Sequence, residues 1–297
     1  MKAIEARTRI QFKNILFATD FSTAANAAAP FAAELAKRYG AKLYALHVRP
    51  PVVNPATPPL TWRGLEEAAE LEDEDHREQL IKAFPGVKPE IEIREGDLWA
   101  NLGDIFEEKN VDLVVIGTRG RSGIAKFVLG SVAEEIFRLS PFPVLTVGPN
   151  VLAAGRRAGE ITRILFATDF SPESGAAAPY ALSLAQECQA RLTMLHVIEE
   201  PKSGEFVHPT DLVNSSTHLL RKLVPDETEL WCAPEFVVEQ GDVAGKILEV
   251  AAREKAELIV LGVRQPTGFP GAATHLPIAI AHKVVSHATC PVMTVRG

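Results

Sequence analysis

The stretch ILFATDFS occurs twice in this chain, at Ile15–Ser22 and again at Ile164–Ser171. Three further pairs of segments follow in the same order at nearly the same offset: LHV at Leu46–Val48 and Leu195–Val197, VDLVVIG at Val111–Gly117 with AELIVLG at Ala256–Gly262, and FPVLTV at Phe142–Val147 with CPVMTV at Cys290–Val295. Four collinear matches indicate an internal duplication. The length of 297 residues suits two domains, which we expect at residues 1–150 and 160–297.

Within each copy, short apolar runs alternate with helical patterns. In the first copy we expect strands at Asn14–Asp20, up to Val48, at Glu90–Glu95, Asp112–Gly117 and Val144–Val147, and helices after Ser22 to Tyr39, at Glu66–Phe84, Leu98–Lys109 and from Gly130. Ser22 and Ser171 are typical N-caps, and Gly40 suits a C-terminal cap. This alternation predicts an α/β fold with about five parallel strands per copy and helices on both faces. Pro50–Thr61 is expected to be a surface loop and Pro149–Glu160 a linker.

Composition narrows the function classes. The net charge is −7, and both copies are acidic, which argues against a nucleic-acid backbone as partner. The cysteines Cys188, Cys232 and Cys290 are far apart and form no CxxC pair, so a disulfide scaffold or thiolate zinc site is not expected. The chain lacks a signal-peptide pattern and a long apolar run, which predicts a cytoplasmic protein with no membrane segment.

The segment after the strand that ends at Gly117 is rich in glycine and positive charge. It reads GTRGRSGIAKFVLGS, with Gly120 early and Gly130–Ser131 at the expected start of the next helix. Glycines allow the backbone to approach a ligand, and a helix N-terminus offers N–H groups to an anion. Arg119 and Arg121 add positive charge to the same loop. An anion site is one interpretation, and a plain strand–loop–helix turn is the other; a P-loop or dinucleotide-binding pattern is absent from the sequence.

Asp20 and Asp169 end the first expected strand of each copy. Ligands of open parallel sheets bind beyond the carboxyl ends of the strands, where the strand order reverses. A carboxylate at that point can accept hydrogen bonds from ribose hydroxyls. It can equally cap a helix or stabilise a turn.

Together, ATDFS, LHV, the G-x2-G-x9-G-S spacing and PVLTV resemble the universal stress protein family. The resemblance covers almost all of the chain, as two tandem domains. It implies a five-stranded parallel sheet of order 3-2-1-4-5 in each domain, the adenine nucleotide alpha hydrolase-like fold. It also implies that two domains pair through strand five, either within one chain as a pseudo-dimer or between two chains as a homodimer.

The family includes ATP-binding and non-binding members, and the glycine pattern is that of the ATP-binding ones. The resemblance therefore implies ATP as the ligand of the first domain, with an accompanying Mg²⁺ left open. It places Asp20 at the ribose beside Ala18 and Thr19, and the backbone of Val48 at the adenine. The residues it places around the phosphates are Gly117, Gly120, Gly130 and Ser131, with Arg119 and Arg121 as neighbours.

The second copy departs from this pattern in the loop. Gln265 replaces Gly120, and Ile278 and Ala279 stand where the first copy has Gly130 and Ser131. The segment is also longer and carries three prolines, which stiffen the chain and remove N–H donors. We therefore expect the second domain not to bind ATP in the family's manner, and instead to stabilise the first domain or form a partner surface.

Other features favour structural roles. His47 and His196 occupy matching strand positions and are expected to be satisfied core or rim histidines. His275, His282 and His287 are expected to be ordinary helix-end or surface residues, because their spacing does not suit chelation. The repeated Gly96–Asp97 and Gly241–Asp242 are expected to supply a turn and an N-cap.

Three functions remain open at this point. The first is an ATP-binding protein that acts in stress response or signalling through binding, without rapid catalysis. The second is a slow ATPase or autokinase with Ser122 or Ser131 as phosphate acceptor, although no acid–base constellation beyond Asp20 is evident. The third is an interaction module with both sites empty.

Overall fold

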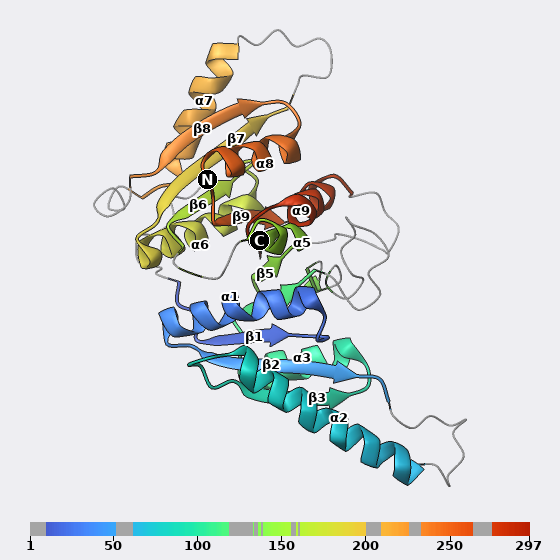
Figure 1. Cartoon of the computed structure of the whole chain (residues 1–297). Helices are drawn as coiled ribbons and strands as arrows, with labels where there is room; N and C mark the ends of the chain where they lie inside the picture. Colours follow the sequence, from blue (N-terminus) through green and yellow to red (C-terminus); the bar gives the residue numbers. More distant parts are fainter. Residues whose placement is uncertain are drawn as a thin grey trace.

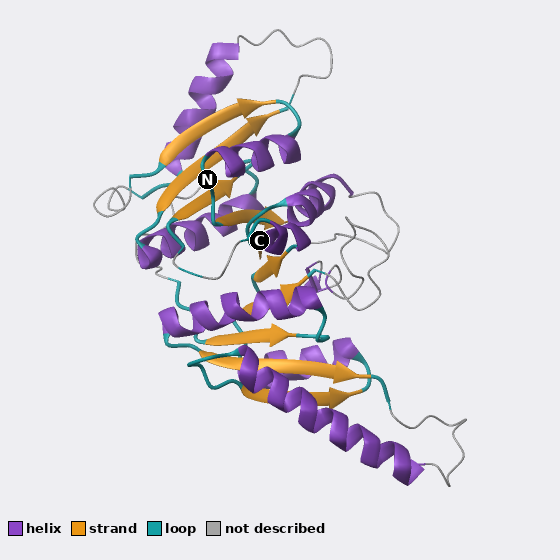
Figure 2. Cartoon of the chain, in the orientation of Figure 1, coloured by secondary structure: helices purple, strands orange, loops and turns teal. Residues whose placement is uncertain are grey.

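The computed structural model describes residues 10–51, 62–118, 133, 136–137, 139–155, 159, 161–199, 209–225, 233–263 and 275–297. We call residues 1–150 the first repeat and residues 160–297 the second repeat. Figure 1 shows them side by side, and Figure 2 shows the sheet of each repeat with helices on both faces.

In the first repeat the elements are β1 (Asn14–Ala18), α1 (Thr23–Tyr39), β2 (Lys42–Arg49), α2 (Trp62–Ala83), β3 (Glu90–Glu95), α3 (Leu98–Lys109), β4 (Leu113–Gly117), β5 (Val144–Val147) and α5 (Pro149–Ala153). In the second they are β6 (Arg163–Ala167), α6 (Pro172–Cys188), β7 (Arg191–Ile198), α7 (Pro209–Lys222), β8 (Glu235–Gln240), α8 (Val243–Arg253), β9 (Leu258–Val263), α9 (His275–His287) and β10 (Val292–Arg296). The acidic helix α2 begins four residues before the expected start at Glu66. The expected surface loop at Pro50–Thr61 lies almost entirely outside the described residues.

Helix ends follow the sequence signals. Ser22 is the N-cap of α1, and Gly40 ends the helix at φ 61°. Asp97 and Asp242 are the N-caps of α3 and α8, as the Gly-Asp pairs predicted. Each cap satisfies a backbone group that the helix itself leaves unbonded.

The described strands form one sheet of ten, in the order β3-β2-β1-β4-β5-β10-β9-β6-β7-β8. Each repeat therefore has the order 3-2-1-4-5, and the expected doubly wound α/β fold is confirmed. All neighbours within a repeat run parallel, whereas β5 and β10 pair antiparallel, with Leu145 opposite Met293. The pairing through strand five thus occurs within one chain.

Two apolar layers cover the sheet, one on each face. Successive strand residues point to opposite faces, so Ile15 and Phe17 of β1 belong to one layer and Leu16 to the other. The first layer holds α1, α2, α6 and α7, and the second holds α3, α8 and α9. Both layers continue across the β5–β10 junction, which makes the two repeats share a core.

The first part of the expected linker packs against the second repeat. Residues Pro149–Ala153 form α5, and Val151 is fully buried. Asn150 donates from its side chain to the carbonyls of Ser286 and His287 at the end of α9. Proline at the first helical position and these contacts to the other repeat explain why this segment is a helix.

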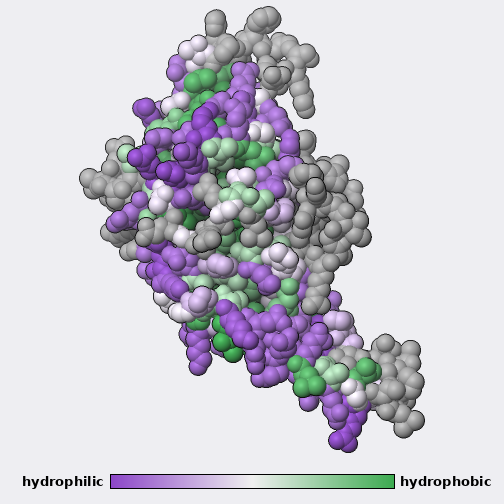
Figure 3. Space-filling model, in the orientation of Figure 1, coloured by the Kyte–Doolittle hydropathy of each residue, from purple (hydrophilic) through white to green (hydrophobic). Residues whose placement is uncertain are grey.

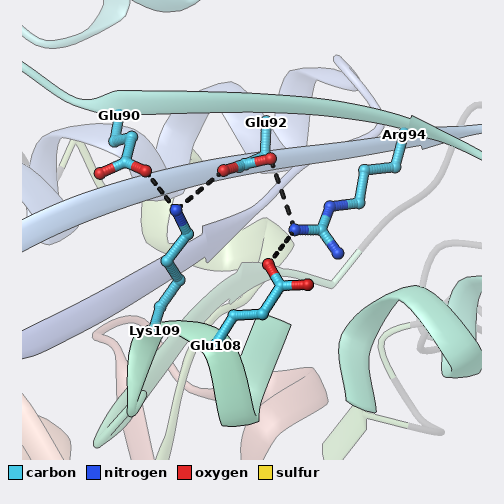
Figure 4. Close-up of polar contacts among 5 residues, drawn as sticks. All are labelled: Glu90, Glu92, Arg94, Glu108 and Lys109. Atoms are coloured by element: carbon cyan, nitrogen blue, oxygen red, sulfur yellow. Dashed lines mark hydrogen bonds and ion pairs between the residues drawn. The ribbon is translucent and has the colours of Figure 1, made fainter. Parts of the chain in front are cut away.

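The outer edge of the sheet at β3 carries charge. Lys109 of α3 bonds Glu90 and also Glu92, the latter at 3.0 Å, and Arg94 bonds Glu108 at 2.6 Å (Figure 4). The hydrogen bond from Arg94 lowers the pKa of the exposed Glu108 carboxyl. Charged side chains on an edge strand discourage pairing with another chain.

We expect the double substitution Glu92→Val with Arg94→Val to make the protein self-associate. It would turn EIEIRE of β3 into an apolar edge strand. Light scattering over a concentration series measures the association. The matched control removes the exposed Arg63–Glu67 ion pair of α2 with the same two changes to valine, and it should leave the mass unchanged. Equal association of both variants would contradict the role of the β3 charges.

The outer surface is mostly hydrophilic on the face shown in Figure 3. The helix α2 carries the exposed apolar residue Leu71, whose exposed fraction is 75%. Among the described helices, none has the length and apolar character that crossing a bilayer requires.

Candidate functional site

The candidate site of the first repeat lies where the carboxyl ends of β1, β2 and β4 meet. Ala18, the last residue of β1, is level with Leu46 of β2 and with Ile116 of β4. The strand order reverses between β1 and β4, and parallel sheets bind ligands at such a point. The structure therefore brings Ala18, Val48 and Gly117 to one end of the sheet.

The turn after β1 fixes the position of Asp20. Thr19 donates its backbone N–H to Leu46 O at 2.9 Å, and its hydroxyl accepts from Phe21 N at 3.0 Å. Asp20 Oδ1 accepts from Ser22 N at 3.0 Å. Phe21 has φ 58°, a conformation that bulky residues rarely adopt.

The second repeat forms the same turn, with Phe170 at φ 62° and Asp169 Oδ1 accepting from Ser171 N. Strained turns of this kind persist only where the surrounding contacts impose them. The turn role that the sequence allowed for both aspartates is therefore confirmed. It leaves further acceptor positions on each carboxylate, since a carboxylate has about four lone-pair sites.

Two histidines stabilise these turns through contacts with backbone carbonyl oxygens. His47 Nδ1 lies 2.9 Å from Thr19 O, and His196 Nδ1 lies 2.9 Å from Thr168 O. The ring of His47 also packs edge-on against Phe21. These contacts confirm the structural role expected from the repeated positions. In the first repeat, His76 of α2 adds a third ring that stacks on Phe21.

Gly117 is required by packing. A Cβ atom at this position would lie 2.2 Å from Ala24 O and 2.5 Å from Ala25 N, in the first turn of α1. Gly262 has the same role, because a Cβ there would lie 2.4 Å from Ser174 Cα. Both glycines let the N-terminus of a helix, α1 or α6, approach the carboxyl end of the neighbouring strand, β4 or β9.

The phosphate half of the predicted site lies outside the described residues: Arg119, Gly120, Arg121, Gly130 and Ser131. The described part ends at Thr118, which donates its backbone N–H to Val147 O at 3.1 Å. Thr118 is 1% exposed, and its hydroxyl has no hydrogen-bond partner in the described structure. No motif in the sequence points to Thr118.

The second repeat has a cavity of about 430 Å³ at the equivalent place. Its lining includes Ala167, Thr168, Asp169, Val197 and Gly262, the counterparts of Ala18, Thr19, Asp20, Val48 and Gly117. The remaining lining residues are Ser174, Leu195, His196, Ile198, Glu199, Val243, Ile247, Leu261, Ile280 and Ala281. The fold thus leaves ligand-sized space beside the residues that the family resemblance selects.

A hydroxyl chain in this cavity was missed by the sequence analysis. Ser174 Oγ donates to Asp169 Oδ1 at 2.8 Å and accepts from Thr168 Oγ1 at 2.9 Å. The first repeat has Ala25 at the position of Ser174, so this series of hydroxyl hydrogen bonds is specific to the second repeat. Aligning the two copies beyond the shared motifs would have shown the difference.

The walls α8 and α9 of the cavity are joined by an ion pair. Asp242 accepts from Gly245 N at 2.9 Å and from Lys283 Nζ at 2.8 Å. The hydrogen bond from Lys283 lowers the pKa of the Asp242 carboxyl. The ammonium group of Lys283 therefore binds Asp242, and Lys283 does not line the cavity.

Comparison with known proteins gives a consistent result. The model of the universal stress protein family matches residues 11–148 and again 160–296. A universal stress protein of Methanocaldococcus jannaschii is 33% identical over 141 residues, which cover 46% of this chain and 82% of that protein. One from Mycolicibacterium smegmatis is 28% identical over 302 residues, 95% of this chain and 96% of the relative.

The solved structure of a universal stress protein from Archaeoglobus fulgidus shares the fold, with a TM-score of 0.69 at 20% identity over 97% of this chain and 99% of that one. The family model covers nearly all of both repeats. The chain belongs to the universal stress protein family.

Proposed function

We propose that the first repeat binds one ATP molecule and that the protein acts in stress response or signalling through this binding, without rapid catalysis. The observation that carries the proposal is the convergence of Asp20, Val48 and Gly117 at one end of the sheet, immediately before a loop with the complete glycine pattern. The second repeat supports a site large enough for a ligand, because its residues equivalent to Asp20, Val48 and Gly117 line a cavity.

Asp20 suits the ribose. Its Oδ1 is fixed by Ser22 N, and no described residue donates to its Oδ2. The side chain is half-buried at the end of β1. A carboxylate held in this way is a strong acceptor for a pair of hydroxyl donors.

Two further observations fit a bound nucleotide. The Thr118 hydroxyl at the end of β4 has no partner in the described structure, and buried polar groups are rarely left unbonded. The loop that follows carries Arg119, Arg121 and Lys126 in an acidic protein. Positive charge and N–H donors favour the triphosphate there.

The carboxyl end of β4 also offers a route by which ATP binding in the first repeat affects the second repeat. Thr118 N bonds Val147 O, and Gly148 follows directly. A Cβ on Gly148 would lie 2.7 Å from Val285 O of α9, so this backbone lies tightly against the second repeat. ATP bound beside the end of β4 would therefore act on a corner that contacts the other half of the protein.

We expect the double variant Gly120→Ala with Gly130→Ala to weaken ATP binding at least tenfold, about 1.4 kcal/mol, because methyl groups would obstruct the approach of the phosphates. Asp20→Asn should weaken it about tenfold, since the amide keeps the turn but loses charge and one acceptor. Isothermal titration calorimetry with ATP, with and without Mg²⁺, gives the dissociation constants.

The matched control is Gly103→Ala on α3, where an added Cβ meets no atom within 4 Å. It should bind ATP as the wild type does. Wild-type protein that binds no ATP, or loop variants that bind it unchanged, would overturn the proposal.

A further inference from the structure

We propose that His76 of α2 is a positioning residue for the ATP site and that its ring makes the affinity for ATP depend on pH. The inference rests on the ATP site proposed above for the first repeat. It starts from three rings in contact. Phe21, in the turn after β1, stacks on His76 with centroids 4.1 Å apart and planes at 8°. His47 of β2 meets both edge-on, at 4.8 Å from Phe21 and 4.9 Å from His76.

The ring cluster, Phe21 with His47 and His76, supports a strained turn. Phe21 has φ 58°, and a bulky residue keeps such a conformation only where its surroundings impose it. Its neighbour Asp20 accepts from Ser22 N and is the proposed ribose residue. The ring of His76, which is 6% exposed, covers the face of Phe21. Loss of this ring would let Phe21 leave the left-handed region and would displace the Asp20 carboxylate.

An ion pair also joins α2 to β2. Arg49 Nε lies 3.3 Å from Asp73 Oδ1, and Arg49 also pairs with Glu95 of β3. Arg49 directly follows Val48, whose backbone the family resemblance places at the adenine. The helix α2 is therefore attached beside both the ribose end and the adenine end of the proposed site.

The second repeat has a smaller version of the ring cluster. Phe170 stacks on His196, with centroids 4.4 Å apart, and no third ring of the described residues packs on Phe170. The helix α7 has Ser216 at the position of His76, counted back from the buried leucine four residues further along each helix. The third ring thus occurs in the repeat for which we propose ATP binding.

Acid should open the ring cluster because it contains two histidines, whose charge ordinarily changes between about pH 5 and 8. One imidazolium is tolerated, since it can face the ring of Phe21 and lies near Glu72, whose carboxylate is 4.0 Å from His76 Nε2. Two buried imidazolium rings 4.9 Å apart would repel each other. The open cluster therefore binds more protons than the closed one, so falling pH favours opening and weakens ATP binding.

The other charged groups around the ring cluster have partners. Asp73 and Glu95 pair with Arg49, and Asp20 is held in its turn. The helix α1, which also packs on α2, carries no charged residue before Glu34. The remaining charged residues of β3 pair on the opposite face of the sheet, where α3 packs: Glu90, Glu92 and Arg94. The two histidines are therefore the residues of the cluster whose type titrates in this range.

The test measures ATP binding by calorimetry with the full chain and two variants of His76. His76→Phe keeps a flat ring on Phe21 but cannot be charged, so it should bind ATP as the wild type does at about pH 7.5. On acidification to about pH 5, its affinity should fall at least about fivefold less than that of the wild type. His76→Ser, which introduces the residue of the second repeat, should bind ATP about fivefold more weakly at neutral pH, because an aromatic contact is lost.

The matched control is His218→Phe on the exposed side of α7. It makes the same change at a surface histidine of the other repeat, so ATP affinity and its pH dependence should both equal those of the wild type. Protonation of ATP itself is common to all the proteins and cancels in the comparison.

Hydrogen exchange of the peptide Ala18–Ala25 reads the turn without ATP. His76→Ser should speed its exchange, His76→Phe should not, and the second-repeat peptide Ala167–Ser174 should stay unchanged in both. Equal pH dependence of the His76→Phe variant and the wild type, or turn exchange that His76→Ser leaves unaltered, would overturn the inference. The expected exchange differences in a wild-type protein that binds no ATP would instead contradict the ATP proposal.

Discussion

Gly117→Ala is expected to destabilise the protein by about 3 kcal/mol or more, near the upper end for overpacked cores. The added Cβ would lie 2.2 Å from Ala24 O and 2.5 Å from Ala25 N. These are backbone atoms of α1, so the clash can be relieved only by moving the helix away from β4. Urea unfolding measures the loss, and the displaced turn should also weaken ATP binding.

The control for this prediction is Gly103→Ala, in the interior of α3. Nothing lies within 4 Å of the added Cβ, so the variant should be unchanged or more stable by up to about 1 kcal/mol, the cost of glycine in a helix. A Gly117→Ala protein as stable as the Gly103→Ala protein would show that α1 does not pack on β4 as described.

Phe12→Ala is expected to cost about 3–5 kcal/mol, because Phe12 is a large side chain that is only 1% exposed. Its ring contacts Tyr39 of α1 edge-on, with centroids 5.1 Å apart, and stacks on Tyr180 of α6 at 6.3 Å. The neighbouring Ile10 exchanges hydrogen bonds with Ser183 of α6. Phe12 therefore packs the start of the first repeat against α6 of the second repeat.

This prediction includes a loss of cooperativity between the repeats. Hydrogen exchange of peptides from β1 and β6 during urea unfolding should show one transition in the wild type and two in Phe12→Ala. Phe17→Ala is the matched control, since Phe17 is equally buried but packs on Phe84 within the first repeat. A single shared transition in Phe12→Ala would contradict the coupling role.

Local signals predicted most of the fold. The caps Ser22 and Gly40 and the apolar run of β1 depend on a few neighbouring residues, so these features can be predicted from the local sequence. The strand order and the β5–β10 pairing came from the family resemblance, because contacts between residues about 150 positions apart leave no local pattern. The helix α5 was missed for the same reason, since its stability depends on contacts with α9 in the other repeat.

The candidate site was predicted only in part. The turn residue Asp20 and the strand-end residues Val48 and Gly117 follow from motifs, and the structure brings them together. The second-repeat cavity could not be predicted, because its volume depends on side chains from three strands and three helices. Gln265 in place of Gly120 indicated a lost phosphate contact, but not that space for a ligand remains.

A crystal structure of the full chain grown with ATP tests the central claim, one ATP site per chain, most directly. We predict density for ATP in the first repeat, with the ribose at Asp20 and the phosphates along the loop after Thr118, and no triphosphate in the cavity beside Asp169. Triphosphate density in the second repeat, or none in the first when ATP is in excess, would contradict it.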